Sequence, residues 1–358
     1  MRNIYLIGRN FNNQVGGPAS IIRGLVKGLN ENNVPVHEVC LSETFGKVSL
    51  IKTLFKILLT KKRCIINVHT DGLKLPNLVY WFSKFDRKND YYLTVHGLYS
   101  IDAKMNGNHK KKYDKIERKL CKKFPKIICV SKLLEETIKL KYHRKKWTCV
   151  VPNGIDVDEL VENSKKQSNN HAIKAVMLGG IRSCKGIFES LELVNYLNKN
   201  NIPTTLSVYG NISNAESYKQ YEGAVARLGL NGLVEYKNCL TKKSDVYQVI
   251  ADSDIQFCLS KWDTFNVAII ESLAIGVPCI ASNQCGASSA ITDGVNGCVL
   301  DLSDENFMTK AKEFILNLET DENRLKRIAQ LSSTIIEQYS WKNVSKLYLS
   351  AINYDIGE

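Results

Sequence analysis

The sequence predicts an α/β protein made of two domains. A chain of 358 residues is long for a single hydrophobic core, because such cores stop growing at about 250–300 residues. Apolar runs of strand length alternate with stretches in which apolar residues recur every three or four positions, the pattern of strands joined by amphipathic helices. This alternation occurs twice, and the polar segment NSKKQSNN at residues 163–170 separates the halves. We interpret that segment as the linker.

The elements can be placed along the chain in order. We expect helices from about residue 19, at 50–63, at 109–126, from 267 and from Trp341 to the end. Glycine-rich loops lie at 9–20 and 179–186, and a Pro-Asn-Gly turn lies within 149–156. The segments that we expect to be strands are 4–8, 34–41, 64–69, 91–96, 127–131, 174–179, 205–210, 234–240, 254–260, the end of 263–282 and part of 293–300.

Cysteine usage and hydropathy bear on the compartment. The eleven cysteines stand singly without a C-x-x-C pair, which suits a reducing cytosol and argues against a disulfide framework or a zinc site. No apolar run reaches the roughly 18–20 residues that cross a bilayer, and no signal-peptide pattern follows residues 4–8. We therefore expect a cytoplasmic protein.

The excess of basic over acidic residues is confined to the first half of the chain. Residues 1–160 hold 30 Lys or Arg and 14 Asp or Glu, a net charge of +16, whereas residues 161–358 hold 19 and 22, a net charge of −3. A basic half should face an anionic partner, and nucleic acid and an anionic membrane surface are the candidates.

Residues 50–63 resemble a helix that lies in a membrane interface, because apolar side chains are mixed with cations along the segment. The alternative is a helix that packs on the core and exposes a lysine-rich outer face. The cations are Lys52, Lys56, Lys61, Lys62 and Arg63.

The most informative stretch is residues 263–282, DTFNVAIIESLAIGVPCIAS. Asp263 precedes a short helix and Glu271 lies about two turns inside it. The helix N-terminus between them is a natural seat for a phosphate. Two carboxylates around such a seat suit a long ligand with a charged middle, such as a nucleotide sugar. The alternatives are that Asp263 is a helix N-cap and that Glu271 is a solvated surface residue.

Other candidate residues follow predicted strands. Gly16 and Gly17 lie between the first strand and a helix, where a glycine loop can cradle a phosphate. The alternative is that they form an ordinary tight turn, which has the same sequence pattern. Arg182 and Lys185 lie on the glycine-rich loop at 179–186, and cations there suit a diphosphate. His96 ends a strand, at the edge where doubly wound sheets bind ligands, and His69 occupies a similar position.

Two acidic pairs have the spacing of a metal-binding D-x-D motif. We interpret Asp156 and Asp158 as a cap on the next helix. Asp252 and Asp254 stand just ahead of a buried strand, and we do not expect them to hold a metal.

The stretch at 263–282 resembles the signature of retaining glycosyltransferases of family four, which have the GT-B fold of two facing Rossmann-like domains and an interdomain cleft. The matching residues are Phe265, Glu271, Ala274, Gly276, Pro278 and Ala281. The resemblance covers nearly the whole chain, and implies an acceptor-side domain at 1–160, a nucleotide-sugar domain at 171–338, and a C-terminal helix at 339–358 that packs back across the cleft.

The resemblance also implies roles for individual residues. Glu271 would hold the ribose, Asp263 would contact the donor sugar, and His96 would approach that sugar. Lys185 and Arg182 would neutralise the diphosphate and Gly16 and Gly17 would lie beside it. The remaining expected contacts are the backbone amides of Thr264, Phe265, Asn266 and Val267 on the donor, and Gly210, Asn238, Cys239 and Leu240 on the side of the base.

The sequence departs from the family pattern at several positions. Asp263 replaces a Glu, and Thr264 and Asn266 replace glycines. Gly180 stands where the family has an Arg, so Arg182 must reach in from two positions later or the contact is missing.

We therefore expect a retaining glycosyltransferase that uses a nucleoside-diphosphate-sugar donor, with no cofactor and no essential metal. The expected acceptor is a lipid-linked saccharide or a surface polysaccharide, on a protein peripherally bound to the inner face of the membrane. A sugar-nucleotide epimerase or hydrolase of the same fold is the alternative, but no clear set of acid–base carboxylates supports it. A nucleic-acid-binding protein would leave Asp263 and Glu271 unexplained, and we expect no nucleic-acid partner.

Overall fold

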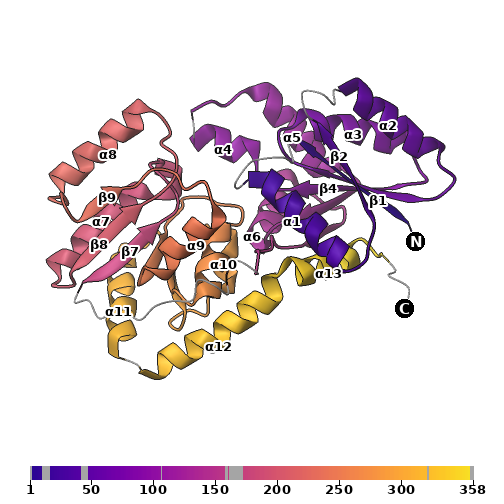
Figure 1. The fold of residues 1–358 in the computed structure, drawn as a ribbon. Coiled ribbons are helices and arrows are strands. Elements are labelled where there is room, and N and C mark those ends of the chain that lie inside the picture. Colours follow the sequence, from indigo (N-terminus) through magenta and orange to yellow (C-terminus); the bar gives the residue numbers. More distant parts are fainter. Residues whose placement is uncertain are drawn as a thin grey trace. The chain divides into compact units, whose positions relative to one another are not determined.

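The computed structural model describes residues 2–9, 17–41, 47–105, 107–157, 160, 172–320 and 322–354. The chain forms two compact units, Met1–Gly154 with Tyr339–Glu358 (unit 1) and Ile155–Gln338 (unit 2) (Figure 1). Gly16, Asp158 and the expected linker at 163–170 lie outside the described residues.

Unit 1 contains a six-stranded sheet in the order β2-β1-β3-β4-β5-β6, and every pair of neighbours is parallel. This order is that of a doubly wound, flavodoxin-like sheet. All residues of β3 and β4 are buried, as expected for central parallel strands. The strands are β1 (Asn3–Arg9), β2 (Val36–Leu41), β3 (Cys64–His69), β4 (Asp90–Val95), β5 (Lys126–Cys129) and β6 (Thr148–Val150).

Of the helices expected in the first half of the chain, one differs clearly from its expected bounds. The helix expected at 50–63 is α2 (Lys47–Leu59), so Lys61, Lys62 and Arg63 lie beyond its end. The hydroxyl of Thr60 donates to the carbonyl of Ile57, which satisfies one of the last carbonyls of the helix. The other helices are α1 (Gly17–Glu31), α3 (Lys74–Phe85), α4 (Tyr99–Met105), α5 (Lys111–Lys123) and α6 (Lys132–Tyr142).

The C-terminal helix α13 (Trp341–Ala351) packs against α1 within unit 1. Its N-cap is Ser340, whose side chain accepts a hydrogen bond from the Asn343 amide. Trp341 is buried on three glycines, because a Cβ at Gly24, Gly28 or Gly154 would lie 1.9, 2.1 or 2.6 Å from its atoms. The glycine of the Pro-Asn-Gly turn therefore serves to seat this tryptophan.

Unit 2 contains a second parallel six-stranded sheet, in the order β12-β11-β10-β7-β8-β9. Counted within the unit, this is the 3-2-1-4-5-6 order of the Rossmann fold. The strands are β7 (Ile173–Met177), β8 (Thr204–Val208), β9 (Val234–Tyr236), β10 (Ile255–Cys258), β11 (Cys279–Ser282) and β12 (Gly297–Leu300). The helices are α7 (Ile187–Lys199), α8 (Ala215–Arg227), α9 (Lys243–Ala251), α10 (Val267–Ile275), α11 (Phe307–Thr320) and α12 (Glu322–Tyr339).

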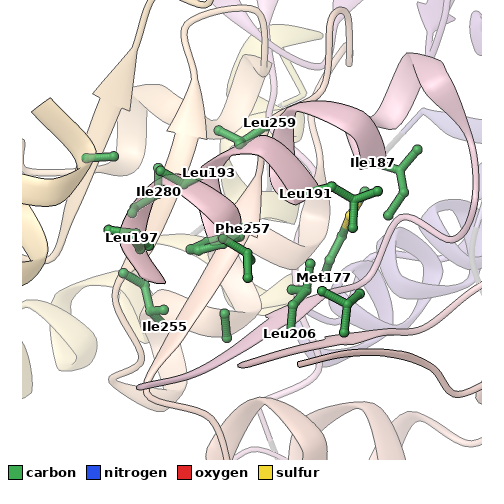
Figure 2. Packing of buried hydrophobic residues seen from close by; sticks show 14 of the residues in the cluster. Met177, Ile187, Leu191, Leu193, Leu197, Leu206, Ile255, Phe257, Leu259 and Ile280 are labelled. Atoms are coloured by element: carbon green, nitrogen blue, oxygen red, sulfur yellow. The ribbon is translucent and has the colours of Figure 1, made fainter. Parts of the chain in front are cut away.

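The core of unit 2 lies between the sheet and the helices α7, α8 and α11. Figure 2 shows Ile187 and Leu191 of α7 pointing toward the sheet residues Met177, Leu206 and Phe257. This packing holds β7 and β10 as a rigid base for the loops that follow them.

Four strands of unit 2 end before the sequence predicts. The segments expected at 174–179 and 254–260 end at Met177 and Cys258, and the other two end near residues with a positive φ. The segment expected at 234–240 ends as a strand at Tyr236, because Asn238 has a left-handed φ of 63° that a strand does not accommodate. The segment expected at 205–210 ends at Val208, since Gly210 has a φ of 126°.

Candidate functional site

The candidate site of unit 2 lies where the strand order reverses, between β7 and β10. The chain leaves β7 toward β8 on one side and leaves β10 toward β11 on the other. Loops that diverge in this way leave a crevice at the carboxyl ends of the strands, where doubly wound sheets bind ligands. Lys185 comes from the loop after β7 and Asp263 from the loop after β10.

Lys185 and Asp263 form an ion pair, with 2.5 Å between Nζ and Oδ2. Burial lowers the pKa of Lys185, but the Asp263 carboxylate outweighs it and the pKa is raised overall. Lys185 therefore stays a cation. The pairing depends on Gly186, because a Cβ there would lie 1.9 Å from the carbonyl oxygen of Leu259.

The position where the family has an arginine cannot accept a side chain here. Gly180 has a φ of 66°, and a Cβ on it would lie 2.1 Å from the carbonyl oxygen of Asn211. Arg182 donates from Nε to the carbonyl of Gly179 at 2.9 Å. Its positive charge lowers the pKa of Lys185 and so partly offsets the effect of Asp263. Arg182 thus lies near Lys185 and is held by its own loop.

Asp263 is held by the backbone on both sides. Its amide donates to Gln284 and its carbonyl accepts from Gly286, each at 2.9 Å. Its Oδ1 accepts from the Phe265 amide at 3.2 Å. The N-cap of α10 is Asn266, so the interpretation of Asp263 as the cap is wrong.

Asn266 explains how this chain does without a glycine of the family pattern. Its φ is 65° and its ψ is 79°, a left-handed conformation that Asn adopts more readily than most residues. Phe265, just before it, is buried. Thr264 and Val267 flank them at the start of α10 and are half-buried.

Glu271 is buried, with 3% of its side chain exposed, so the interpretation of it as a surface residue is wrong. It accepts a hydrogen bond from Lys243 at the start of α9, and the Lys243 ammonium lies 5.2 Å from the centre of the Tyr247 ring. Sequence reasoning missed Lys243, because it is the second of two adjacent lysines and no spacing distinguishes it from Lys242.

The residues expected on the side of the base cluster after β8 and β9. The Gly210 amide donates to the carbonyl of Asn238 at 3.0 Å, and the Tyr236 hydroxyl donates to the carbonyl of Gly210 at 2.7 Å. Cys239 is exposed and Leu240 is half-buried. These loops follow strands at the same edge of the sheet as Lys185.

Unit 1 brings together two histidines at the ends of β3 and β4. His69 Nδ1 and His96 Nε2 are 2.9 Å apart, so one donates and the other accepts a hydrogen bond. The rings are stacked, with centroids 5.2 Å apart. Both line a cavity of about 20 Å³, which is room for about one water molecule. Gly17 begins α1 with a φ of 72°, in the same unit.

Burial keeps both histidines neutral. Burial lowers the pKa of His96 to about 4. Burial also lowers the pKa of His69 well below its ordinary value, and the repulsion that a proton on His96 would exert lowers it further. Nε2 of His69 is buried and has no hydrogen-bond partner among the described residues. The hydrogen bond to His96 therefore fixes the orientation of the His69 ring.

The acidic pair before β10 has structural partners. Asp252 accepts from the Gln248 side chain at 2.9 Å, and Asp254 accepts from the backbone amide of Lys174 at 3.0 Å. Within the described ranges no group of three or more His, Cys, Asp or Glu residues is placed to hold a metal ion.

Family models match both halves of the chain. The model described as Glycosyltransferase Family 4 matches residues 47–159, and that described as Glycosyl transferases group 1 matches residues 159–332. The chain belongs to glycosyltransferase family four. Its two Rossmann-like units are those of the predicted GT-B fold.

Relatives of this glycosyltransferase support the assignment. A UDP-Gal:α-D-GlcNAc-diphosphoundecaprenol α-1,3-galactosyltransferase of Escherichia coli is 25% identical over 276 residues, which cover 72% of this chain and 69% of the relative. Two solved structures share the fold with a TM-score of 0.73 and cover 99% of this chain and 100% of their own. They are sucrose-phosphate synthase of Thermosynechococcus elongatus, 15% identical, and HepE of Anabaena in complex with UDP, 14% identical.

The described helices of the glycosyltransferase do not have the properties of membrane spans. In the ranges that the structure describes, none is both long enough and apolar enough to cross a bilayer.

Proposed function

We propose that this glycosyltransferase transfers a hexosyl group, with retention of configuration, from a nucleoside-diphosphate sugar to a lipid-linked saccharide or a surface polysaccharide. The observation that carries the donor part is the Lys185–Asp263 ion pair at the switch point of unit 2, with buried Glu271 on the following helix. A cation beside two carboxylates suits a ligand that has a diphosphate between two groups rich in hydroxyls.

Each residue has a physical role in this proposal. Lys185, with Arg182 nearby, balances the charge that develops on the leaving diphosphate, which lowers the barrier to transfer. Asp263 accepts hydrogen bonds from the sugar hydroxyls and Glu271 from those of the ribose. Neutral His96 takes part in the transfer step as a hydrogen-bonding group. The mechanism needs no metal, since lysine and backbone amides supply the positive potential.

The relatives support the choice of substrates. The E. coli relative is named for a UDP-galactose donor and a diphosphoundecaprenol-linked acceptor, and HepE was solved with UDP and with UDP-glucose. We propose UDP as the nucleotide and an acceptor bound by basic unit 1, at an anionic membrane surface.

A thermal-shift titration tests the donor part. UDP and UDP-sugars should raise the unfolding temperature of the wild-type protein, because ligands that bind the folded state stabilise it, whereas uridine should have a much smaller effect. EDTA should leave the shift unchanged. If no nucleoside diphosphate or nucleotide sugar raises the unfolding temperature, the proposed function fails.

A further inference from the structure

An unusual group of apolar side chains is exposed on α2 and α3 of unit 1. Of the twelve large apolar side chains that are exposed among the described residues, five lie on these two helices. Leu59 and Phe85 are 83% and 82% exposed. We call this group the apolar face, and its members are Val48, Phe55, Leu59, Trp81 and Phe85.

The apolar face is continuous across the two helices. Val48, Phe55 and Leu59 lie on one side of α2, because they are separated by seven and four residues, and Trp81 and Phe85 are likewise four residues apart on α3. The rings of Phe55 and Phe82 meet edge to face, with centroids 5.3 Å apart. Figure 1 shows α2 and α3 side by side in unit 1.

A second contact joins the C-terminal ends of these helices. Lys88, which follows α3, donates from Nζ to the carbonyl of Leu58 at 3.0 Å. This bond holds the loop after α3 against the last turn of α2, where Leu59 is exposed. The face is thus a built surface whose two halves are fixed to each other.

Cations surround the apolar face and few anions accompany them. Residues 47–90 contain ten Lys or Arg and three Asp. Of these acids, Asp86 and Asp90 are buried and accept hydrogen bonds within the unit, which leaves Asp71. Lys84 and Lys119 lie 5.0 and 5.2 Å from the centre of the Trp81 ring.

The lysines near Trp81 repel one another. The pKa of Lys119 is lowered by burial and then by the charges of Lys84 and Lys123. An anion bound beside Trp81 would relieve this repulsion. A surface that combines exposed aromatic and leucine side chains with crowded lysines matches the boundary between lipid headgroups and acyl chains.

We propose that the apolar face of α2 and α3 docks on a bilayer that contains anionic lipids. The apolar side chains enter the headgroup boundary, and the surrounding lysines contact the lipid phosphates. A nucleic acid would use the lysines but would leave Leu59, Phe85 and Val48 exposed, so a membrane is the partner that uses both features. This inference rests on the proposed lipid-linked acceptor and names the surface that meets its membrane.

Vesicle co-sedimentation tests the proposal with the full-length chain. The probe is vesicles of phosphatidylcholine with 30% phosphatidylglycerol, compared with phosphatidylcholine alone, at low and high salt. We expect binding to the anionic vesicles that weakens as salt rises. A wild-type protein that stays in the supernatant with anionic vesicles at low salt overturns the proposal.

Paired variants separate the two features of the surface. Leu59→Ser with Phe85→Ser removes apolar contacts, and Lys61→Glu with Lys62→Glu reverses charge. At about 5-fold in affinity per lysine, the charge variant should bind anionic vesicles at least about 30-fold more weakly. Arg63 is left unchanged, because it pairs with buried Asp90, and its loss would destabilise the unit.

Matched controls lie on unit 2. Leu316→Ser changes an exposed apolar side chain on α11. Lys219→Glu with Lys237→Glu reverses two charges elsewhere on unit 2. These variants should bind vesicles like the wild type. If they lose binding as strongly as the α2 and α3 variants, the surface is wrong.

A UDP thermal shift on every variant checks folding and keeps the two proposals distinct. Variants that respond to UDP and still bind vesicles like the wild type overturn the docking surface alone. A wild type that binds vesicles through this surface without responding to any nucleotide sugar overturns the proposed function alone.

Discussion

At the scale of the residue, Lys185 and Asp263 place two opposite charges side by side in the candidate site. Lys185 is one of 49 basic residues, yet the switch point of the sheet places it 2.5 Å from a carboxylate that belongs to another loop. The pair holds a cation and an anion in the same half-buried place. A diphosphate would bind the lysine and a sugar hydroxyl would bind the aspartate.

Replacing Lys185 with Ala should cost about 1.5–3 kcal/mol of UDP affinity, the size of a hydrogen bond to a charged group. Affinity for uridine should change little, because uridine has no phosphate. Isothermal titration measures both. Lys261→Ala is the control, since Lys261 lies in the next loop but pairs with Glu189. Equal losses for UDP and uridine would show that Lys185 does not contact the diphosphate.

Replacing Asp263 with Asn keeps the shape of the side chain and removes its charge. We expect turnover to fall by about 10²–10³-fold, the usual effect of losing one electrostatic contact in a transition state, with UDP affinity largely kept. Transfer from a radiolabelled UDP-sugar and UDP titration measure the two quantities. Loss of UDP affinity together with turnover would instead indicate that Asp263 mainly shapes the loop.

Replacing Glu271 with Ala should weaken UDP binding by about 1.5–3 kcal/mol and abolish any preference for UDP over 2′-deoxy-UDP. The second readout is specific, because only a contact to the ribose senses the missing hydroxyl. Lys243 is half-exposed, so the loss of its partner should leave the protein folded, which circular dichroism can check. An unchanged preference for UDP would contradict the ribose role.

At the scale of the element, α13 completes unit 1 although it is far from that unit in sequence. Its Trp341 sits where α1 and the Pro-Asn-Gly turn have no side chains. Tyr348 of the same helix accepts a hydrogen bond from Asn67 of β3 at 3.1 Å. The helix thus contributes core to a sheet that the N-terminal half of the chain forms.

Replacing Trp341 with Ala should therefore lower the free energy of unfolding of unit 1 by about 3–5 kcal/mol, the usual cost of emptying a large buried aromatic site. Urea denaturation followed by circular dichroism measures it. Leu347→Ala on the same helix is the control, since Leu347 is 49% exposed and should change stability by less than about 0.5 kcal/mol. Similar effects of the two changes would contradict the packing described.

At the scale of the whole molecule, buried histidines make the stability of unit 1 depend on pH. Unit 1 buries two neutral histidines. Unfolding exposes them, so below their ordinary pKa of 6.5 the unfolded chain binds protons that the folded chain does not. Stability from this source is complete above about pH 6.5 and is lost as pH falls from there toward 4.

The expected loss is up to about 1.4 kcal/mol per pH unit for each histidine. Urea denaturation at pH 7.5, 6.0 and 5.0 should show it in the transition of unit 1. A His69→Gln/His96→Asn variant should lose less stability over the same interval. If the variant loses as much as the wild type, carboxylates elsewhere dominate the acid response.

The order of the elements, the two α/β halves and the family could be predicted from the sequence. A short run of mostly apolar residues marks a buried strand by itself, and the strand expected at 64–69 has the same bounds in the structure. The segment at 263–282 resembles the family signature, and the sequence singles out Glu271 by its spacing from Asp263 and Lys185 by its place on a glycine-rich loop. Their roles stay predictions.

Contacts between residues far apart in sequence were decided by the tertiary structure. The sheet order places Lys185 against Asp263, packing of α9 on α10 places Lys243 against Glu271, and adjacent strands bring His69 to His96. The positive φ angles of Asn266 and Gly180 likewise depend on the surrounding structure, and the amino-acid sequence alone does not specify them. These features could not be read from the chain, because spacing along a sequence reports neighbours in one element, whereas a site forms where separate elements end side by side.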